Sequence, residues 1–446
     1  MNIFKLLTYD VAEHNCIWKI HQDKSWPTFW TSLRRRYVRL FRKITLKRLL
    51  HYWKHPFYEL SEPLKPLTFI TISGNNDRAM DPMTKGLPVD SYSVIDQRDQ
   101  NKHIPTSLVL FYSLLYIWPL LKCYFIADKH KKSIIAEYFD DFFDTIGFMV
   151  VIEKLLRHSD VKLIVMANDH VSFNRAFLRV AQELGVKTMY VQHCSVTTEF
   201  PPLEFTYSFL DGEESLLKYI AHEHPKGNVY LSGNARFDIM SRYKNVKGKS
   251  KLTIGIAINQ LDDENVIKQL CMTLQSHSCK NIILRPHPCQ EFKSTWYSEH
   301  GISCSDSKVE NPFEYLSHVD ILISGESGIH LDAAMMGVCS ICYSTSGEKP
   351  LDWYSYIKNG LITYAANMEE LLALLSNKNA DRQKSQQAKL RWYNAAYGTK
   401  HEGHIGEMLT DFLRHEQEGD IEGFDKKYGF VEKNVDGVMC KVYSER

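Results

Sequence analysis

From residue 67 onward the sequence alternates between short apolar runs rich in β-branched residues and longer helical stretches. In the first half, the runs predicted to be strands are residues 67–73, 162–167, 187–192, 205–210 and 228–231. Residues 172–184 are predicted to form a helix that Gly185 ends. Because strands separated by helices of this length form βαβ units, the chain is predicted to contain a parallel sheet covered by helices.

The same pattern starts again after residues 243–251, a polar, basic and glycine-containing stretch that we interpret as a linker. The strands predicted in the second half are 252–258, 281–284, 320–324 and 338–343, and the helices are 263–276 and 327–336. A chain of 446 residues is also too long for a single compact core. The predicted fold class is therefore α/β, with two Rossmann-like parallel-sheet domains. Such sheets bind ligands at the carboxyl ends of their strands, here in a cleft that both domains face.

These patterns divide the chain into four predicted segments. Residues 1–60 form a basic helical extension, 61–245 the first Rossmann-like domain and 246–380 the second. Residues 381–446 form helices and a tail that pack back across the hinge, with a helical and polar stretch at 381–415.

The extension contains residues 33–54, with nine Lys or Arg and no acidic residue. Leu33, Tyr37, Leu40 and Ile44 recur at helical spacing, so a helix here has one apolar stripe between basic flanks. Two interpretations stay open. The helix lies on an anionic membrane surface, or its apolar stripe packs on the domain behind it.

Residues 108–127 are long and apolar enough to span a bilayer, which needs about 20 residues. Pro119 and Lys122 interrupt the run, so a buried or membrane-dipping helix is the preferred interpretation.

Composition excludes several classes of function. There are 54 Lys or Arg and 53 Asp or Glu, so the net charge is only +1 and nucleic acid is not an expected partner. The ten cysteines are dispersed like buried thiols, which suits a reducing cytoplasm. Asp10 and Glu13 interrupt the place where a signal peptide has its apolar core. We expect a cytoplasmic protein that reaches the inner face of the cytoplasmic membrane through residues 33–54.

The predicted strand 281–284 leads directly into Arg285, Pro286, His287 and Pro288. The two prolines stiffen this turn, so Arg285 and His287 are expected to project from a fixed loop. A guanidinium can bind a phosphate through two hydrogen bonds, and an imidazolium can bond or protonate a leaving oxygen. A plain proline turn with a structural histidine is the alternative.

Residues 320–337 read as a strand, a turn of small residues and a helix. The turn contains Ser324, Gly325, Glu326, Ser327 and Gly328. Its glycines permit close backbone approach, and the start of the following helix presents N–H groups to an anion. Glu326 would repel a phosphate, so it is expected to bind a ribose hydroxyl. Alternatively, the small residues only let the helix pack closely.

Polar residues also follow the strands of the first half. His193 is a general-base candidate and Asp211 a second one. A structural hydrogen bond or a turn explains either residue equally well. The further candidates near the same strand ends or the hinge are Asp169, His170, Gln192, Arg236 and Asp238. No P-loop or dinucleotide motif is present, and no residue set is predicted to bind a metal.

The order of four short motifs resembles that of GT-B glycosyltransferases of bacterial capsule and lipopolysaccharide synthesis. The motifs are VQHCS at 191–195, SGNARFD at 232–238, RPHP at 285–288 and SGESG at 324–328, the last followed by Asp332 and Gly337. The nearest relatives by this resemblance are bacterial sialyltransferases and polysialyltransferases, Kdo transferases and CDP-glycerol glycerophosphotransferases. The resemblance covers roughly residues 160–345.

The resemblance implies roles for individual residues. The His-Pro motif of the family falls on His287, and its serine motif on Ser324 and Ser327, which implies contact with the donor phosphate. The acid-acid-Gly motif of sialyltransferases falls on residues 210–212, where Leu210 replaces the first acid and Asp211 keeps the second. The His-Gly pair of glycerophosphotransferases reads here as His193 followed by Cys194.

The resulting hypothesis is a metal-independent GT-B glycosyltransferase with no cofactor besides its nucleotide-sugar donor. A CMP-linked acid sugar such as sialic acid or Kdo is favoured as donor, and a glycan or glycolipid as acceptor. The second domain would bind the nucleotide through residues 285–287 and 324–328. The first would bind the acceptor through Asp169, His170, Gln192 and Arg236, with His193 or Asp211 as base. A retaining route would need a carboxylate nucleophile, Asp211 or Asp238.

Three alternatives stay open. A CDP-polyol phosphotransferase shares much of the fold and the motifs. A UDP-N-acetylglucosamine 2-epimerase also has two such domains, and it would act without any acceptor. The chain could also be a non-catalytic, membrane-docked assembly subunit.

Overall fold

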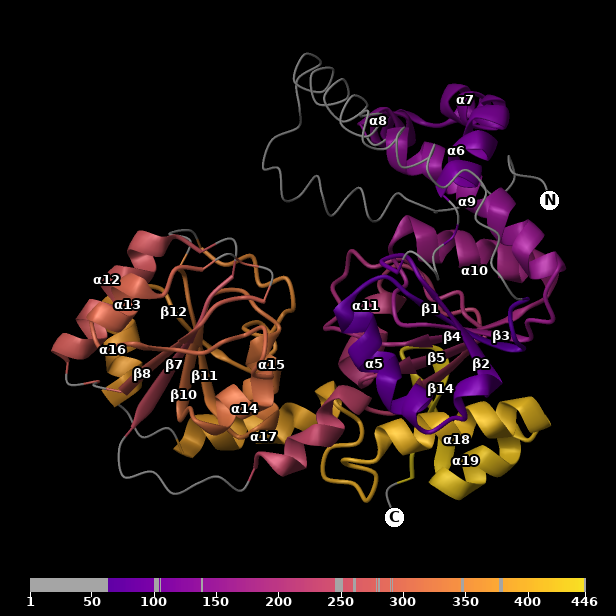
Figure 1. The fold of residues 1–446 in the computed structure, drawn as a ribbon. Helices are drawn as coiled ribbons and strands as arrows, with labels where there is room; N and C mark the ends of the chain where they lie inside the picture. Colours follow the sequence, from indigo (N-terminus) through magenta and orange to yellow (C-terminus); the bar gives the residue numbers. More distant parts are fainter. Residues whose placement is uncertain are drawn as a thin grey trace. The chain divides into compact units, whose positions relative to one another are not determined.

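The computed structural model describes residues 63–99, 104, 106–137, 139–244, 252–259, 262–277, 279, 281–288, 290, 292–345, 349–376 and 380–444. The basic segment 33–54 lies outside these residues. The described chain forms two compact units, each an α/β body around its own sheet (Figure 1). Unit 1 contains the described residues up to His193, then Thr198–Asn234 and the described residues from Gly406 onward. Unit 2 contains Cys194–Thr197 and Ala235–Ile405.

Unit 1 is built on an eight-stranded sheet, here called sheet A, in the order β13-β14-β6-β5-β4-β3-β1-β2. Its strands are β1 (Leu67–Thr71), β2 (Tyr92–Asp96), β3 (Leu163–Met166), β4 (Lys187–Val191), β5 (Tyr207–Leu210), β6 (Asn228–Leu231), β13 (Phe430–Val435) and β14 (Val438–Tyr443). All neighbours pair in parallel except the β13–β14 hairpin. The five strands predicted for this half are confirmed, and they are buried because helices cover both faces of a parallel sheet.

The helices of unit 1 follow the strands in the manner of βαβ units. They are α5 (Gly74–Lys85), α6 (Thr106–Leu115), α7 (Ile117–Ile126), α8 (Lys129–Glu137), α9 (Phe139–Arg157), α10 (Ser172–Leu184), α11 (Glu213–Ile220), α18 (Ile405–Glu418) and α19 (Ile421–Tyr428), with a 3-10 turn at Val89–Ser91. Helix α10 has the predicted bounds. Gly185 ends it with φ +70°, a left-handed conformation that glycine adopts without strain.

The apolar run at 108–127 forms two helices, not one. Among the described helices, none is long and apolar enough to cross a bilayer alone. Ser107–Leu115 and Ile117–Ile126 meet that criterion only together, and they are bent by 56°. Helices α6, α7 and α8 pack on the long helix α9, which in turn packs on α10. Part of the run is therefore buried, as predicted, and part is exposed.

Unit 2 is built on a six-stranded, fully parallel sheet, here called sheet B, in the order β12-β11-β10-β7-β8-β9. Its strands are β7 (Thr253–Ala257), β8 (Asn281–Arg285), β9 (Ser303–Cys304), β10 (Ile321–Ser324), β11 (Cys339–Tyr343) and β12 (Thr363–Ala365). Its helices are α12 (Glu264–Ser276), α13 (Thr295–Glu299), α14 (Pro312–Ser317), α15 (Ile329–Met335), α16 (Met368–Ser376) and α17 (Ala380–Tyr393), with a 3-10 turn at Ala235–Arg242. One apolar core lies on each face of the sheet. The prediction of an α/β chain with two parallel sheets is confirmed.

The C-terminal region is divided between the two units. Helix α17 belongs to unit 2, whereas α18, α19 and the β13–β14 hairpin belong to unit 1. Phe412 of α18 packs on Phe209 of β5, and Lys187 of β4 forms an ion pair with Glu416 at 2.6 Å. The first border also differs from the expected one, since residues from Ala235 onward already pack in unit 2.

Candidate functional site

The carboxyl edge of sheet A collects most of the polar residues singled out from the first half. Strands β3, β4 and β5 are neighbours and parallel, so the residues that follow them meet at one edge. Asp169 and His170 follow β3, Gln192 and His193 follow β4, and Asp211 follows β5. The sequence placed these five residues at a common edge, and the structure brings them together there.

Asp169 and His170 form a dyad at this edge. Asp169 has no exposed surface, and its Oδ1 lies 3.0 Å from Nδ1 of His170. Its Oδ2 accepts a hydrogen bond from the Tyr219 hydroxyl at 2.6 Å. Because a carboxylate only accepts, the neutral His170 ring has its proton on Nδ1 and a lone pair on Nε2. The His170 side chain is 27% exposed, so a substrate group can reach the ring.

The loop that presents His170 is fixed by its own backbone. Asn168 Oδ1 accepts hydrogen bonds from the N–H groups of His170 at 3.2 Å and Val171 at 2.9 Å. This is the local turn chemistry that asparagine favours at a strand end. Asn76 of α5 donates to the carbonyl of Ala167 at 3.3 Å, which ties the loop after β1 to the same strand end.

The electrostatics keep Asp169 ionised. Burial opposes its ionisation, but the hydrogen bond and charge of His170, the Tyr219 hydroxyl and the nearby His193 outweigh burial, so the pKa of Asp169 lies below its ordinary value. Burial and the adjacent Asp169 raise the pKa of Tyr219 well above its ordinary value, so it stays a neutral donor. The dyad is a buried anion beside a half-exposed imidazole.

Aromatic rings complete the surroundings of His170. The Phe200 ring lies 4.8 Å from it, and the His193 ring stacks on it at 6.0 Å. The sequence pattern indicates His193 as a base candidate and His170 as an acceptor contact. In the structure, His170 is the histidine whose Nδ1 is hydrogen-bonded to the buried Asp169 carboxylate.

The expected roles of Gln192 and Asp211 do not fit their places. Both are 1% exposed. The Gln192 amide accepts from the Asp211 N–H at 2.9 Å and donates to the Ser215 hydroxyl at 3.0 Å. Asp211 Oδ1 accepts from Asn234 at 2.8 Å. This buried network links the ends of β4, β5 and β6, and such burial does not suit a base, a nucleophile or a sugar contact.

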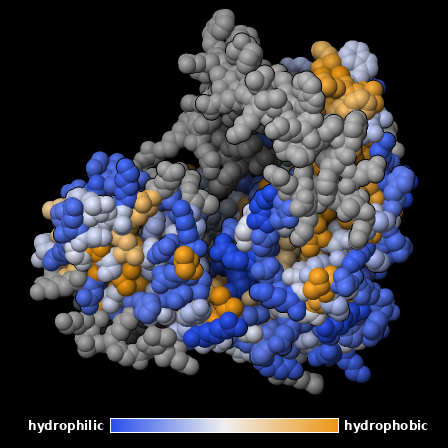
Figure 2. Space-filling model, viewed as in Figure 1, coloured by the Kyte–Doolittle hydropathy of each residue, from blue (hydrophilic) through white to orange (hydrophobic). Residues whose placement is uncertain are grey.

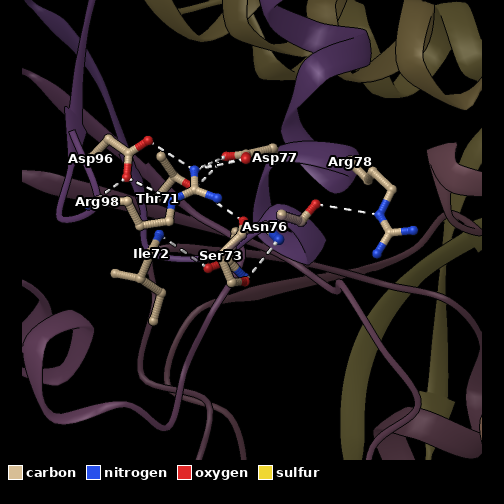
Figure 3. Close-up of polar contacts among 9 residues, drawn as sticks. Thr71, Ile72, Ser73, Asn76, Asp77, Arg78, Asp96 and Arg98 are labelled. Atoms are coloured by element: carbon tan, nitrogen blue, oxygen red, sulfur yellow. Dashed lines mark hydrogen bonds and ion pairs between the residues drawn. The ribbon is translucent and has the colours of Figure 1, made fainter. Parts of the chain in front are cut away.

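A further cluster at this edge escaped sequence reasoning (Figure 3). Arg98 lies between Asp77 of α5 and Asp96 of β2, with N–O distances of 2.7 and 2.8 Å. The Thr71 hydroxyl donates to Asp77 at 2.6 Å. Hydrogen bonds from the guanidinium to both carboxylates raise the pKa of Arg98. The signal for this cluster in the sequence is Asp77, an acid in the first turn of the helix that follows β1.

The candidate residues of unit 2 lie at the carboxyl edge of sheet B, after β8 and β10 with β7 between them. Arg285 does not project from a loop as expected. It is 4% exposed and donates to the Ser305 hydroxyl at 2.7 Å and the Glu310 carbonyl at 2.8 Å. His287, two residues later, is exposed. Of these two side chains, His287 is the exposed one.

The turn after β10 is held by side-chain contacts that correct two expectations. The buried Ser324 hydroxyl donates to the Ala257 carbonyl at 2.8 Å, so it does not point to a ligand. Glu326 accepts from the N–H groups of Leu351 and Trp353, each at 2.8 Å. The Glu326 carboxylate therefore holds residues 351–353 in place. This differs from the expectation that it binds a ribose hydroxyl. Ser327 caps the Ile329 N–H at 3.4 Å.

Gly325 and Gly328 lie at the two ends of this turn, and a buried histidine fixes the first. His330 Nε2 donates to the Gly325 carbonyl at 2.8 Å, and its Nδ1 accepts from the Ser340 hydroxyl at 2.6 Å. Burial lowers the pKa of His330 to about 4. The neutral His330 ring therefore fixes the Gly325 end of the turn through this hydrogen bond. The signal for it was a polar residue on the apolar face of the 327–336 helix.

Arg236 and Asp238 belong to unit 2, contrary to the expectation that Arg236 binds the acceptor with the first domain. Arg236 forms an ion pair with Asp332 of α15 at 2.5 Å. Asp238 Oδ1 accepts from the Ile405 N–H at 3.1 Å. These contacts fix the packing of unit 2 and do not suit Asp238 as a nucleophile. In the part of the chain that the structure describes, no group of three His, Cys, Asp or Glu is arranged to hold a metal ion.

The sequence matches no protein-family model and no curated protein. Solved structures are similar in fold. One is the UDP-GlcNAc 2-epimerase of Neisseria meningitidis bound to UDP-GlcNAc, at 10% identity and a TM-score of 0.49, with 78% of this chain and 99% of that one covered. The S. aureus MnaA–UDP structure has 11% identity and a TM-score of 0.49, covering 80% and 97%.

The wall teichoic acid polymerase TagF, soaked with CDPG, has 13% identity and a TM-score of 0.47, covering 89% of this chain and 100% of that one. The names of these three structures include UDP-GlcNAc, UDP and CDPG, respectively, as the molecules present with each protein. At these identities and TM-scores, the similarity concerns the course of the chain and assigns no reaction to this protein.

The neutral His330 makes unit 2 sensitive to acid. The unfolded chain takes up the proton near pH 6.5, whereas the folded ring stays neutral to about pH 4. The free energy of unfolding is therefore fully present above about pH 6.5 and falls by roughly 1.4 kcal/mol per pH unit down to about pH 4. We expect His330→Gln to flatten this slope, as measured by urea unfolding with hydrogen exchange of sheet B peptides.

The exposed His318 is the control, and a His318→Gln variant should keep the wild-type slope. Equal slopes in wild type and His330→Gln would contradict the assignment.

Proposed function

We propose that this protein transfers a group from a nucleotide-activated donor to a hydroxyl acceptor, with His170 as general base. The observation that carries the proposal is the fully buried Asp169, hydrogen-bonded to Nδ1 of the half-exposed His170. Such an arrangement orients an imidazole and stabilises its protonated form. The finer proposal follows the resemblance of the motifs. The donor is a nucleotide sugar, with a CMP-linked acid sugar favoured, and the acceptor is a surface glycan or glycolipid.

The chemistry assigned to unit 1 is proton removal. As the acceptor oxygen forms its bond to the anomeric carbon of the donor, His170 Nε2 takes the acceptor proton. The bond between that carbon and the phosphate oxygen breaks, and the nucleotide leaves with the bonding electron pair. The ionised Asp169 stabilises the resulting imidazolium, and Tyr219 holds the other carboxylate oxygen in place. The proton then passes from His170 to water.

The chemistry assigned to unit 2 is binding of the leaving phosphate. His287 is the exposed member of the proline turn, and the turn of residues 325–328 offers backbone N–H groups at the same edge of sheet B. Asn259, which follows the intervening strand β7, donates to the Glu326 carbonyl at 3.2 Å and so links the strand ends. An imidazolium and oriented N–H groups are suited to a phosphate that gains charge as it leaves.

The dyad predicts a loss of turnover without a loss of nucleotide binding. We expect His170→Gln to lower transfer by about 10²–10⁴-fold, the usual contribution of a general base. Asp169→Asn should lower it comparably, because an amide can hold the ring in the wrong tautomer. The measurement is release of free nucleotide in the presence of a glycan acceptor, with CMP-, CDP- and UDP-linked donors tested in parallel. The exposed His158, which bonds a backbone carbonyl through Nδ1, is the matched control, and His158→Gln should be unaffected.

Three outcomes of this assay would overturn parts of the proposal. Wild-type turnover in His170→Gln would remove the base. Interconversion of a UDP-sugar without any acceptor would indicate an epimerase, and transfer only from CDP-polyols would indicate a phosphotransferase.

The proline turn of residues 285–288 predicts an effect on nucleotide binding, in contrast to the effect on turnover predicted for the dyad. We expect His287→Ala to weaken nucleotide binding at least tenfold, because it removes the exposed imidazole from the phosphate. The measurement is the thermal shift of the full chain with CMP, CDP, UMP and UDP. His170→Gln should keep the wild-type shift in the same panel. An unchanged shift in His287→Ala, or no shift with any of the four nucleotides, would contradict the role given to unit 2.

A further inference from the structure

The outer face of helices α6 and α7 is apolar and exposed. Half of the large hydrophobic side chains exposed in the described part of the chain lie within residues 111–126. They are Phe111, Leu114, Leu115, Tyr116, Trp118, Phe125 and Ile126, with exposed fractions from 37% to 75%. Figure 2 shows hydrophobic residues gathered where Figure 1 places α7. We call these seven residues the apolar patch. Patches of this kind mark interaction surfaces.

The patch lies outside the apolar cluster that holds α7 against its neighbouring helices. Helix α7 packs on α8 and α9 through its opposite face, where Leu120 and Cys123 are buried with Phe142. Trp118 and Phe125, seven residues apart, therefore share the outward face. Helix α6 is also fixed, because a Cβ on Gly147 of α9 would lie 2.0 Å from the Val109 carbonyl oxygen. The apolar patch thus lies on two helices that pack against the rest of unit 1.

Lysine residues border the apolar patch. Lys122 and Lys129 are exposed, and Lys131 and Lys132 are half-buried at the start of α8. Between residues 107 and 135, Asp128 is the single acidic residue of the sequence. Aromatic and aliphatic side chains next to lysines match the boundary between the headgroups and acyl chains of an anionic bilayer.

We propose that the apolar patch and its lysines bind the surface of an anionic lipid bilayer without spanning it. The bend of 56° between the two helices and the cations beside them suit an interfacial position. A second copy of this chain is disfavoured as the occupant, since a symmetric contact would bring two lysine groups together. Residues 33–54 are disfavoured too, because they have nine cations and no acid.

The proposal is tested by co-sedimentation of the full chain with phosphatidylcholine vesicles, with and without phosphatidylglycerol. We expect binding only to the anionic vesicles, weakened by salt, and at least a tenfold loss of binding in Trp118→Ser combined with Phe125→Ser. The matched control is Met272→Ser combined with Leu351→Ser, two side chains of unit 2 that are 54% and 70% exposed. It should bind like the wild type.

Several results would overturn the proposal. These are no binding of the wild type, equal binding to neutral vesicles, or wild-type binding of the Trp118 and Phe125 variant, which would assign binding to residues 33–54. A change of oligomeric state in that variant, without vesicle binding by the wild type, would identify a second copy as the occupant. The variant should keep transfer to a soluble acceptor, so failure here is distinct from failure of the proposed reaction.

The depth of insertion distinguishes an interfacial from a spanning position. The difference in fluorescence between wild type and Trp118→Phe reports on Trp118 alone. We expect lipids brominated near the headgroup to quench this signal more than lipids brominated at the acyl chain ends. Stronger quenching by the deep label would contradict an interfacial position.

Discussion

The buried carboxylate of Asp169 is the constraint around which the polar edge of sheet A is organised. A carboxylate with no exposed surface is costly unless each oxygen has a partner. One oxygen is bonded by His170 and the other by Tyr219, whose hydroxyl also lies 3.2 Å from that of Tyr190 on β4. The stabilisation of this one anion therefore fixes the orientation of His170. The role proposed for unit 1 depends on that orientation.

In unit 2, buried and half-buried polar side chains are also bonded to partners, but these partners are mostly groups of the surrounding loops. Its charged and polar side chains largely hold loops in place. Arg285 is bonded to the Ser305 and Glu310 loop, Glu326 to the N–H groups of residues 351 and 353, and His330 to the Gly325 carbonyl. His287, in contrast, is exposed.

Local signals in the sequence predicted most helices and strands of the two sheets. The features that were not predicted depend on contacts between residues far apart in the sequence. Helix α10 and strand β6 have the predicted bounds, because a C-terminal glycine and a short apolar run determine them within a few residues. The β13–β14 hairpin was not predicted, since it joins sheet A beside β6, some 200 residues earlier. The edge of the sheet that holds the candidate site was also predicted from strand ends. The roles were not predicted. Arg285 and Glu326 are bonded to residues 20 to 27 positions away. His170 follows Asp169 directly, but the second partner of that carboxylate, Tyr219, lies 50 positions away.

The most direct test of the central claim is the tautomer of His170. Nitrogen-15 NMR of histidine-labelled protein, with His170 assigned by its loss in His170→Gln, reads which ring nitrogen has the proton at a pH where the ring is neutral. The account predicts a protonated Nδ1 and an unprotonated Nε2 in the wild type, and loss of that preference in Asp169→Asn. A proton on Nε2 in the wild type, or the same spectrum in Asp169→Asn, would contradict it.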